Sequence, residues 1–137
     1  MRYLLDTNIL AEPNKPQPNQ KVLDRLDQFA ATIATSSVTW HELWFGTGRL
    51  VPSRRRQNLE AYLRNLITTQ LPVLSYTPEA ARWFATERSK LFKLGLPPSY
   101  PDGQIAAIAA VNDLILVTRN TSDFIHFDGL RLENWFD

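Results

Sequence analysis

The sequence contains no cysteine, which excludes disulfide bonds, thiolate metal sites and cysteine nucleophiles. It has no apolar run long enough to cross a bilayer, and the stretch after Met1 is too short and too polar for the apolar part of a signal peptide. Walker-type phosphate loops, Rossmann glycine motifs and nucleophile-elbow motifs are missing as well. We therefore expect a cytoplasmic protein that does not span a membrane.

The chain has 137 residues, of which 44% are hydrophobic and 21% charged, and these values are typical of a single globular domain spanning residues 1–137. The formal net charge is only +1, so overall charge gives little attraction to nucleic acid. Its arginines, however, are concentrated at Arg49, Arg54, Arg55, Arg56 and Arg64. This cluster has two interpretations: contacts to phosphates, or the solvated face of a helix.

Short apolar or β-branched segments alternate with longer amphipathic ones along the chain. The short segments predict strands, and the longer ones, in which apolar residues recur every three or four positions, predict helices. We expect strands within 2–6, 32–38, 71–76, 114–118 and 130–134, and helices within 21–33, 39–48, 53–70, 77–95 and 102–111. This order predicts an α/β fold, with a mostly parallel sheet of about five strands between layers of helices.

Four carboxylates stand at junctions between the predicted elements: Asp6, Glu42, Asp102 and Asp123. Asp6, Glu42 and Asp123 each follow a strand, and residues that follow parallel strands collect at the carboxyl edge of the sheet. Asp102 precedes a strand, but it begins a helix that runs antiparallel to the sheet, and such a helix starts at the same edge. We expect all four side chains to meet there.

Each of these acids, taken alone, is also explained as a helix cap. Asp6, Asp102 and Asp123 lie near predicted helix starts, and Thr39 and Glu42 have the spacing of a capping box. A cap contributes on the order of 1 kcal/mol, whereas two charges about 4 Å apart repel by around 4 kcal/mol at an effective dielectric of about 20. A convergent set therefore needs a raised pKa or a cation. Oxygen ligands without His or Cys favour Mg²⁺, with Mn²⁺ as a second choice.

Small polar residues flank the acids: Thr7, Asn8, Thr118 and Asn120. They are candidates for holding metal-bound water or a substrate oxygen, although Asn and Thr are equally common in turns. Gly103, next to Asp102, is expected to leave room for the backbone of a ligand. Neither His41 nor His126 has a partner at metal-binding spacing, so neither is expected to be a ligand.

Four segments, in order, carry a resemblance to a known family: "LLDTNIL" from residue 4, "SSVTWHELWFG" from 36, "PDGQIAAIAA" from 101 and "LVTRNTSDF" from 116. Together they resemble the PIN-domain ribonucleases, and most closely the VapC-type toxins of bacterial toxin–antitoxin pairs. The resemblance covers essentially the whole chain. It implies a PIN-like α/β/α fold and an acidic site of Asp6, Glu42, Asp102 and Asp123, supported by Asn8, Thr118 and Asn120.

The resemblance further implies a Mg²⁺-dependent endoribonuclease, in which a metal-activated water cuts RNA and leaves a 5′-phosphate and a 3′-hydroxyl. The cluster of Arg49, Arg54, Arg55 and Arg56 is then expected to position the RNA backbone. Such toxins form homodimers and are inhibited by a cognate antitoxin protein. Certain apolar residues either form a groove for the antitoxin or pack internally: Leu43, Trp44, Phe45, Leu50, Leu59, Tyr62 and Leu63.

Two other functions fit the same residues. A PIN-like nuclease of RNA maturation would have the same site, and a small antitoxin reading frame just upstream would distinguish a toxin from it. A non-catalytic α/β binding module would use the acids only as caps and the arginines for docking. The thermal stability of such a module would not respond to Mg²⁺.

Overall fold

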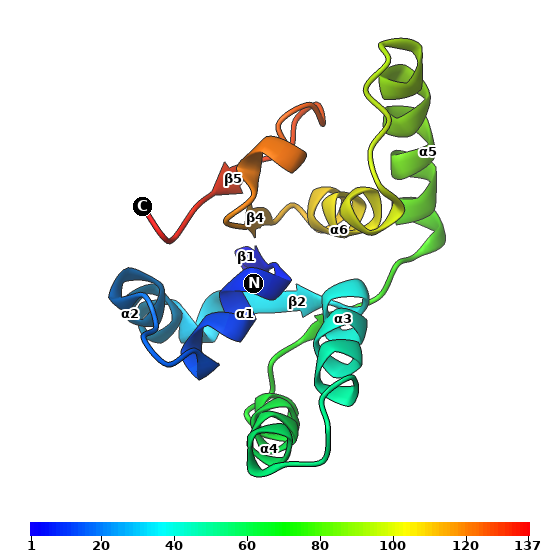
Figure 1. Ribbon diagram of the computed structural model, residues 1–137. Helices are drawn as coiled ribbons and strands as arrows, with labels where there is room; N and C mark the ends of the chain where they lie inside the picture. Colours follow the sequence, from blue (N-terminus) through cyan, green and yellow to red (C-terminus); the bar gives the residue numbers. More distant parts are fainter.

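The computed structural model describes residues 1–137 and is built around one five-stranded sheet (Figure 1). The strand order is β3-β2-β1-β4-β5, so the first strand of the chain lies at the centre. All four pairings between neighbouring strands are parallel. The strands are short: β1 Tyr3–Leu5, β2 Ile33–Ser36, β3 Val73–Leu74, β4 Ile115–Val117 and β5 Leu132–Glu133. The predicted α/β class and number of strands are confirmed, and the sheet is wholly parallel.

Helices connect the strands and follow the sequence signals closely. Thr77 caps α5, since its side chain accepts the N–H of Ala80, and Gly95 just past the end of that helix has a φ of 73°. No helix is both long and apolar enough to pass through a membrane. The helices are α1 Thr7–Ala11, α2 Gln20–Gln28, α3 Ser37–Gly48, α4 Arg54–Thr68, α5 Pro78–Lys93 and α6 Tyr100–Val111, with 3-10 turns η1 Glu12–Asn14, η2 Ala30–Thr32 and η3 Thr121–Asp123.

Alternate side chains of the strands are buried against two different layers of helices. Leu4 and Leu116 point to one face of the sheet and belong to the core that includes α5 and α6. Leu5 and Val117 point to the other face and belong to the core that includes α1 and α2. Because helices cover both faces, the central strands are apolar throughout. The three-layer α/β/α arrangement is confirmed (Figure 1).

Helix α3 begins two residues earlier than predicted, because a serine caps it. The Ser36 hydroxyl accepts the N–H of Thr39 at 3.0 Å, and the helix starts at Ser37. The predicted capping box of Thr39 and Glu42 is therefore wrong. Glu42 lies beyond the first turn of α3, where its carboxylate is free to face another element.

Helix α6 also begins two residues early, and again a serine is the cap. The Ser99 hydroxyl accepts the N–H of Asp102 at 3.2 Å, so that α6 starts at Tyr100. Asp102 is therefore the third residue of the helix rather than its first. Its carboxylate is not needed to terminate the backbone hydrogen-bond ladder.

Gly103 has a packing role and not the ligand-binding role that the sequence analysis predicted. It is buried in the first turn of α6, next to α5. A Cβ at residue 103 would overlap the ring of Phe84, which is itself only 3% exposed. The missing side chain therefore lets α6 approach α5 closely, and it leaves no space for a ligand backbone.

Candidate active site

The carboxyl edge of the sheet brings the predicted site residues together from different elements. Asp6 directly follows β1 and Thr118 directly follows β4, and these two central strands are paired. Glu42 comes from α3, Asp102 from α6 and Asp123 from η3. These three elements reach the same edge because α3 and η3 follow strands, whereas α6 starts there and leads back to β4.

Asp6 is the most buried of the four acids, with 7% of its surface exposed. Its backbone N–H donates to the Val117 carbonyl at 3.0 Å, which ties it to β4. One carboxylate oxygen, Oδ1, accepts the N–H of Thr7 at 2.8 Å, so Asp6 caps α1. The other oxygen, Oδ2, accepts the hydroxyl of Thr118 at 2.8 Å. Both oxygens of Asp6 are therefore held in a defined position.

A second side-chain contact links Glu42 to the same corner. The Thr7 hydroxyl donates to Oε2 of Glu42 at 2.8 Å, although the two residues are 35 positions apart in the sequence. Thr7 thus contacts Asp6 through its backbone and Glu42 through its side chain. This bridge fixes α3 relative to α1 and keeps the half-buried Glu42 beside Asp6.

The other predicted polar residues order the loop that follows β4. Oδ1 of Asn8 accepts the N–H of Arg119 at 3.0 Å. Oγ1 of Thr118 accepts the N–H of Asn120 at 3.1 Å, while Asn120 itself is exposed. Asn8 and Thr118 therefore hold the backbone that leads to Asp123. The sequence analysis did not single out Arg119, whose guanidinium lies 4.5 Å from the ring centroid of Phe136.

Burial and mutual repulsion raise the pKa of two of the acids. Burial is the main reason that the pKa of Asp6 is raised; its hydrogen bonds oppose the shift, and the negative charges of Glu42 and Asp123 add to it. Burial is also the main reason that the pKa of Asp102 is raised, and the charges of Asp123 and Asp6 contribute again. Each of the four acids therefore acts electrostatically on at least one other.

The four acids are not arranged as a closed metal-binding site. No three carboxylates or histidines lie close enough together, with the side chains as they stand, to share one ion. The donor set still fits Mg²⁺, because every donor is an oxygen and this ion uses one or two carboxylates while keeping several waters. A nearby cation would offset the burial and the repulsion that disfavour the ionised forms of Asp6 and Asp102.

Helix capping does not account for the set of acids. Asp6 is the only one of the four whose side chain caps a helix. The caps of α3 and α6 are Ser36 and Ser99, and no side chain caps η3. Side-chain capping therefore does not explain Glu42, Asp102 or Asp123, although Asp102 and Asp123 lie in the first turns of α6 and η3, where a negative charge complements the helix dipole.

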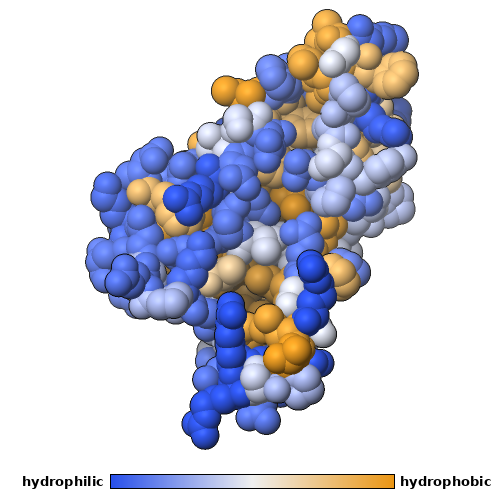
Figure 2. Space-filling view, in the orientation of Figure 1, coloured by the Kyte–Doolittle hydropathy of each residue, from blue (hydrophilic) through white to orange (hydrophobic).

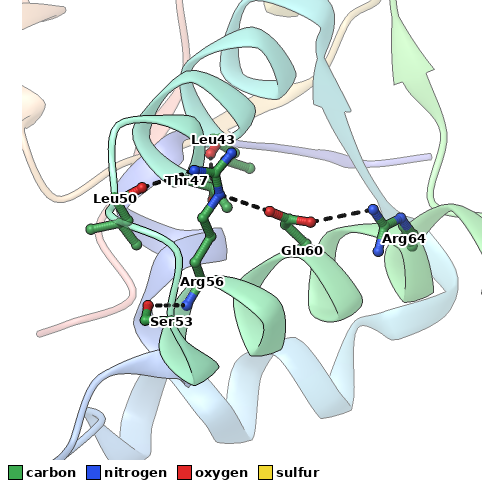
Figure 3. A network of polar contacts seen from close by, with 7 residues as sticks. All are labelled: Leu43, Thr47, Leu50, Ser53, Arg56, Glu60 and Arg64. Atoms are coloured by element: carbon green, nitrogen blue, oxygen red, sulfur yellow. Dashed lines mark hydrogen bonds and ion pairs between the residues drawn. The ribbon is translucent and has the colours of Figure 1, made fainter.

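The arginine cluster divides into two kinds of residue. Arg56 is bound within the fold: its guanidinium donates to the Leu50 carbonyl and to the Glu60 carboxylate, both at 2.9 Å (Figure 3). It holds the loop between α3 and α4 and is not a free contact for phosphate, contrary to expectation. The members with exposed side chains are Arg49, Arg54, Arg55 and Arg64, of which Arg64 also pairs with Glu60 at 3.4 Å.

The residues considered for an antitoxin groove are partly packed against the rest of the chain. Leu43 packs against the core under α1 and α2, and Leu63 is 2% exposed. The Tyr62 hydroxyl donates to the Leu10 carbonyl at 2.7 Å, and burial raises the pKa of Tyr62 to about 12. Phe45 differs from the rest of this set because it is 59% exposed.

A cleft beside Glu42 was missed by the sequence analysis. It has a volume of about 470 Å³ and lies between α3 and the start of α6. The signal that could have revealed it is the recurrence of His41, Phe45 and Arg49 at every fourth position, which places these residues on one face of a helix. The cleft is lined by Ser37, Val38, His41, Glu42, Phe45, Pro101 and Gln104.

Known proteins resemble this chain in both sequence and fold. Residues 3–130 match the sequence profile of the PIN domain. Ribonuclease VapC2 of Haemophilus influenzae is 35% identical over 136 residues, and tRNA(fMet)-specific endonuclease VapC of Salmonella typhimurium is 30% identical over 138 residues, covering 98% of both partners in each case. The solved structure of FitAcB from Neisseria gonorrhoeae matches with a TM-score of 0.89 at 31% identity, over 98% of each chain. The chain therefore belongs to the PIN-domain family and, within it, to the VapC-type ribonucleases.

Proposed function

We propose that this chain is a Mg²⁺-dependent endoribonuclease, with Mn²⁺ as an alternative ion, whose catalytic site consists of Asp6, Glu42, Asp102 and Asp123. The observation that carries the proposal is that the four acids meet at one edge of the sheet, where burial first and the charges of neighbouring acids second raise the pKa of Asp6 and Asp102. Acids that repel one another at a single edge of the sheet favour a cation between them. The names of full-length relatives, a ribonuclease and a tRNA-specific endonuclease, support RNA as the substrate.

The side chains have distinct tasks in this proposal. One or two of the four acids would bind the ion directly and the others would act through its bound waters; the ion would supply charge stabilisation for the phosphate and lower the pKa of water. Thr7 keeps Glu42 in place and Thr118 keeps Asp6 in place, each through a hydroxyl donated at 2.8 Å. Water adds to phosphorus and loses a proton, the bond from phosphorus to O3′ breaks and O3′ gains a proton, so the products carry a 5′-phosphate and a 3′-hydroxyl.

We also propose that the chain is the toxin of a toxin–antitoxin pair, that it acts as a homodimer in the cytoplasm, and that a cognate antitoxin inhibits it. Similar solved structures come from toxin–antitoxin systems, which supports this role. Expression of the chain alone is expected to arrest bacterial growth, and the product of a small upstream reading frame should restore it. RNA cleavage without growth arrest would instead favour a nuclease of RNA maturation.

Removal of divalent ions is expected to abolish RNA cleavage. The purified chain should cut structured RNA in Mg²⁺, and the new ends should be 5′-phosphates, detected with an exonuclease that requires them. Excess EDTA should stop the reaction, and added Mn²⁺ or Mg²⁺ should restore it. Cleavage that persists in EDTA would exclude the metal mechanism, and a chain that cuts no RNA in either ion would exclude the nuclease.

Mg²⁺ is expected to raise the melting temperature of the chain, because an ion that binds only the folded state stabilises it by about 2.7 kcal/mol at 100 times its dissociation constant. Differential scanning fluorimetry with increasing Mg²⁺ measures the shift, and added NaCl at matched ionic strength is the control. An unchanged melting temperature would favour the non-catalytic binding module, whose acids need no ion.

The exposed arginines are expected to contribute to RNA binding through phosphate contacts. Arg54→Ala with Arg55→Ala should raise the KM for RNA and reduce the slope of log K against log salt by about 1 to 2, because each lost phosphate contact lowers it by about 0.7 to 0.9. Arg56→Ala is the matched control, since its side chain is already bound to Glu60. This control should lower thermal stability slightly and leave the salt dependence unchanged. Equal salt slopes for all variants would remove the arginines from the RNA interface.

A further inference from the structure

The cleft beside Glu42 begins at the acidic site and continues along α3. Glu42 and Phe45 both line it, and Pro101 and Gln104 of α6 form the opposite wall. Glu42 also accepts a hydrogen bond from the Thr7 hydroxyl, and the backbone N–H of Thr7 donates to Asp6, so Thr7 links the cleft to Asp6. A molecule that occupies the cleft therefore extends directly from the proposed catalytic acids.

An aromatic platform stands on the cleft side of α3. The rings of His41 and Phe45 are nearly parallel, at an interplanar angle of 10° with centroids 6.2 Å apart. The guanidinium of Arg49 lies 5.6 Å from the centroid of Phe45 on the next turn. Residues four apart lie on one face of a helix, so these three side chains form a continuous row. Figure 2 shows apolar surface around the C-terminal end of α3, with strongly hydrophilic side chains on either side.

The exposure of Phe45 is unusual for its surroundings. Its neighbours Leu43 and Trp44 are at least half-buried, whereas Phe45 leaves 59% of its surface in water. A phenyl ring exposed to this extent forgoes much of the stabilisation that burial would give it. The contacts with His41 and Arg49 orient the ring without covering it.

We infer that the row of His41, Phe45 and Arg49 is a stacking subsite for an unpaired nucleotide next to the scissile phosphate of RNA. This inference rests on the proposed ribonuclease function and specifies its substrate as a single-stranded or looped RNA segment. An unpaired base stacks on the Phe45 ring, which every base can do because each has a π-face. Arg49 supplies the positive charge for the neighbouring phosphate.

The charges along α3 fit an RNA backbone that runs from the proposed catalytic acids toward Arg49. Glu42 lies at the catalytic end of the row and Arg49 at the far end, about 10 Å further along the helix axis at 1.5 Å per residue. The RNA backbone therefore meets a site for a cation at one end and a fixed cation at the other. Bases in a duplex are already stacked on their neighbours, so a double-stranded segment does not offer a free face to Phe45.

Variants of Phe45 test the inference through the KM for RNA. Phe45→Ala is expected to raise KM for an unstructured RNA oligonucleotide about 10-fold or more, with kcat nearly unchanged. Phe45→Trp should keep KM near that of the wild type because the stacking face is retained, whereas Phe45→Leu should resemble Phe45→Ala. Phe92→Ala is the matched control, since Phe92 is 73% exposed on α5 and lies outside the cleft.

A second substrate separates base stacking from other roles of Phe45. An oligonucleotide with an abasic site beside the mapped cleavage position should lose affinity for the wild type, and Phe45→Ala should then cause no additional loss. Independent, additive losses would overturn the inference. A normal KM for Phe45→Ala would also overturn the inference, even if the only defect of this variant were weaker inhibition by an antitoxin protein. In both of these cases cleavage by the wild type shows that the nuclease function itself holds, whereas a wild-type chain that cuts no RNA removes both proposals.

Discussion

Replacement of Asp6 by asparagine is expected to reduce RNA cleavage by on the order of 100-fold or more while raising the melting temperature of the chain. The loss of activity follows because Asp6 is proposed to hold the ion, which contributes several kcal/mol to stabilising charge in the transition state. Asp102→Asn should act in the same direction. Both variants should also lose the stabilisation by Mg²⁺ that we expect for the wild type.

The gain in stability follows from the direction of the pKa shift. The pKa of Asp6 is raised by folding, so the folded chain binds the proton more tightly than the unfolded chain does. This contribution favours folding below the ordinary pKa of aspartate and is lost as pH rises through the folded value. At neutral pH the ionised carboxylate therefore opposes folding, and asparagine removes that charge. Its Oδ1 can still accept the N–H of Thr7, which preserves the cap of α1, and its Nδ2 can donate to Oγ1 of Thr118 in place of the hydrogen bond that Asp6 accepts.

The measurement is kcat on a mapped RNA together with thermal unfolding in EDTA, and Asp27→Asn provides the matched control. Asp27 lies exposed on α2, so the same chemical change there should alter neither activity nor the response to Mg²⁺. Wild-type cleavage rates in both Asp6→Asn and Asp102→Asn would refute the acidic site. A loss of activity accompanied by a lower melting temperature in EDTA would indicate damage to the fold and would contradict the electrostatic argument.

The layered fold could be predicted because its signals are local or depend only on chain order. Apolar strands such as Ile115–Val117 require helices on both faces, and the sheet edge at which Asp6 and Asp123 lie follows from the direction of parallel strands. The helix predicted within 77–95 is likewise confirmed, because the residues that bound it, Thr77 and Gly95, are close to it in the sequence. These features do not depend on how distant side chains meet.

Features that depend on contacts between distant segments could not be predicted. Spacing alone suggested that Glu42 turns back to Thr39, whereas the folded chain brings Thr7 within hydrogen-bond distance of Glu42. Arg56 and Glu60 lie four residues apart on α4, so this ion pair could have been predicted from spacing, whereas the contact of Arg56 with the Leu50 carbonyl depends on the turn between α3 and α4. The acids repel one another but do not form a closed metal-binding site, and this arrangement depends on side-chain rotamers and burial.

The role of Gly103 also depends on a contact between distant segments, and its replacement has the second large expected effect. Gly103→Ala is expected to lower the free energy of unfolding by about 2 kcal/mol or more, since overpacking costs roughly 3 kcal/mol here and improved helix propensity returns only about 1. The cause is the overlap between the new Cβ and the buried ring of Phe84. In thermal unfolding this should appear as a fall of roughly 6 to 10 °C in melting temperature. Because Asp102 is the adjacent residue, displacement of α6 should also reduce RNA cleavage.

The same substitution at Gly46 should have the opposite sign. Gly46 lies inside α3, and a Cβ there meets no atom within 4 Å, so Gly46→Ala should gain the helix propensity of about 1 kcal/mol without a clash. A second control is Phe84→Leu, which is destabilising alone but removes the ring that a side chain at 103 would meet. Combined with Gly103→Ala it should cost less than the sum of the two single changes. Additive losses, or equal melting temperatures for the alanines at 103 and 46, would show that close approach of α5 and α6 is not the reason for glycine at this position.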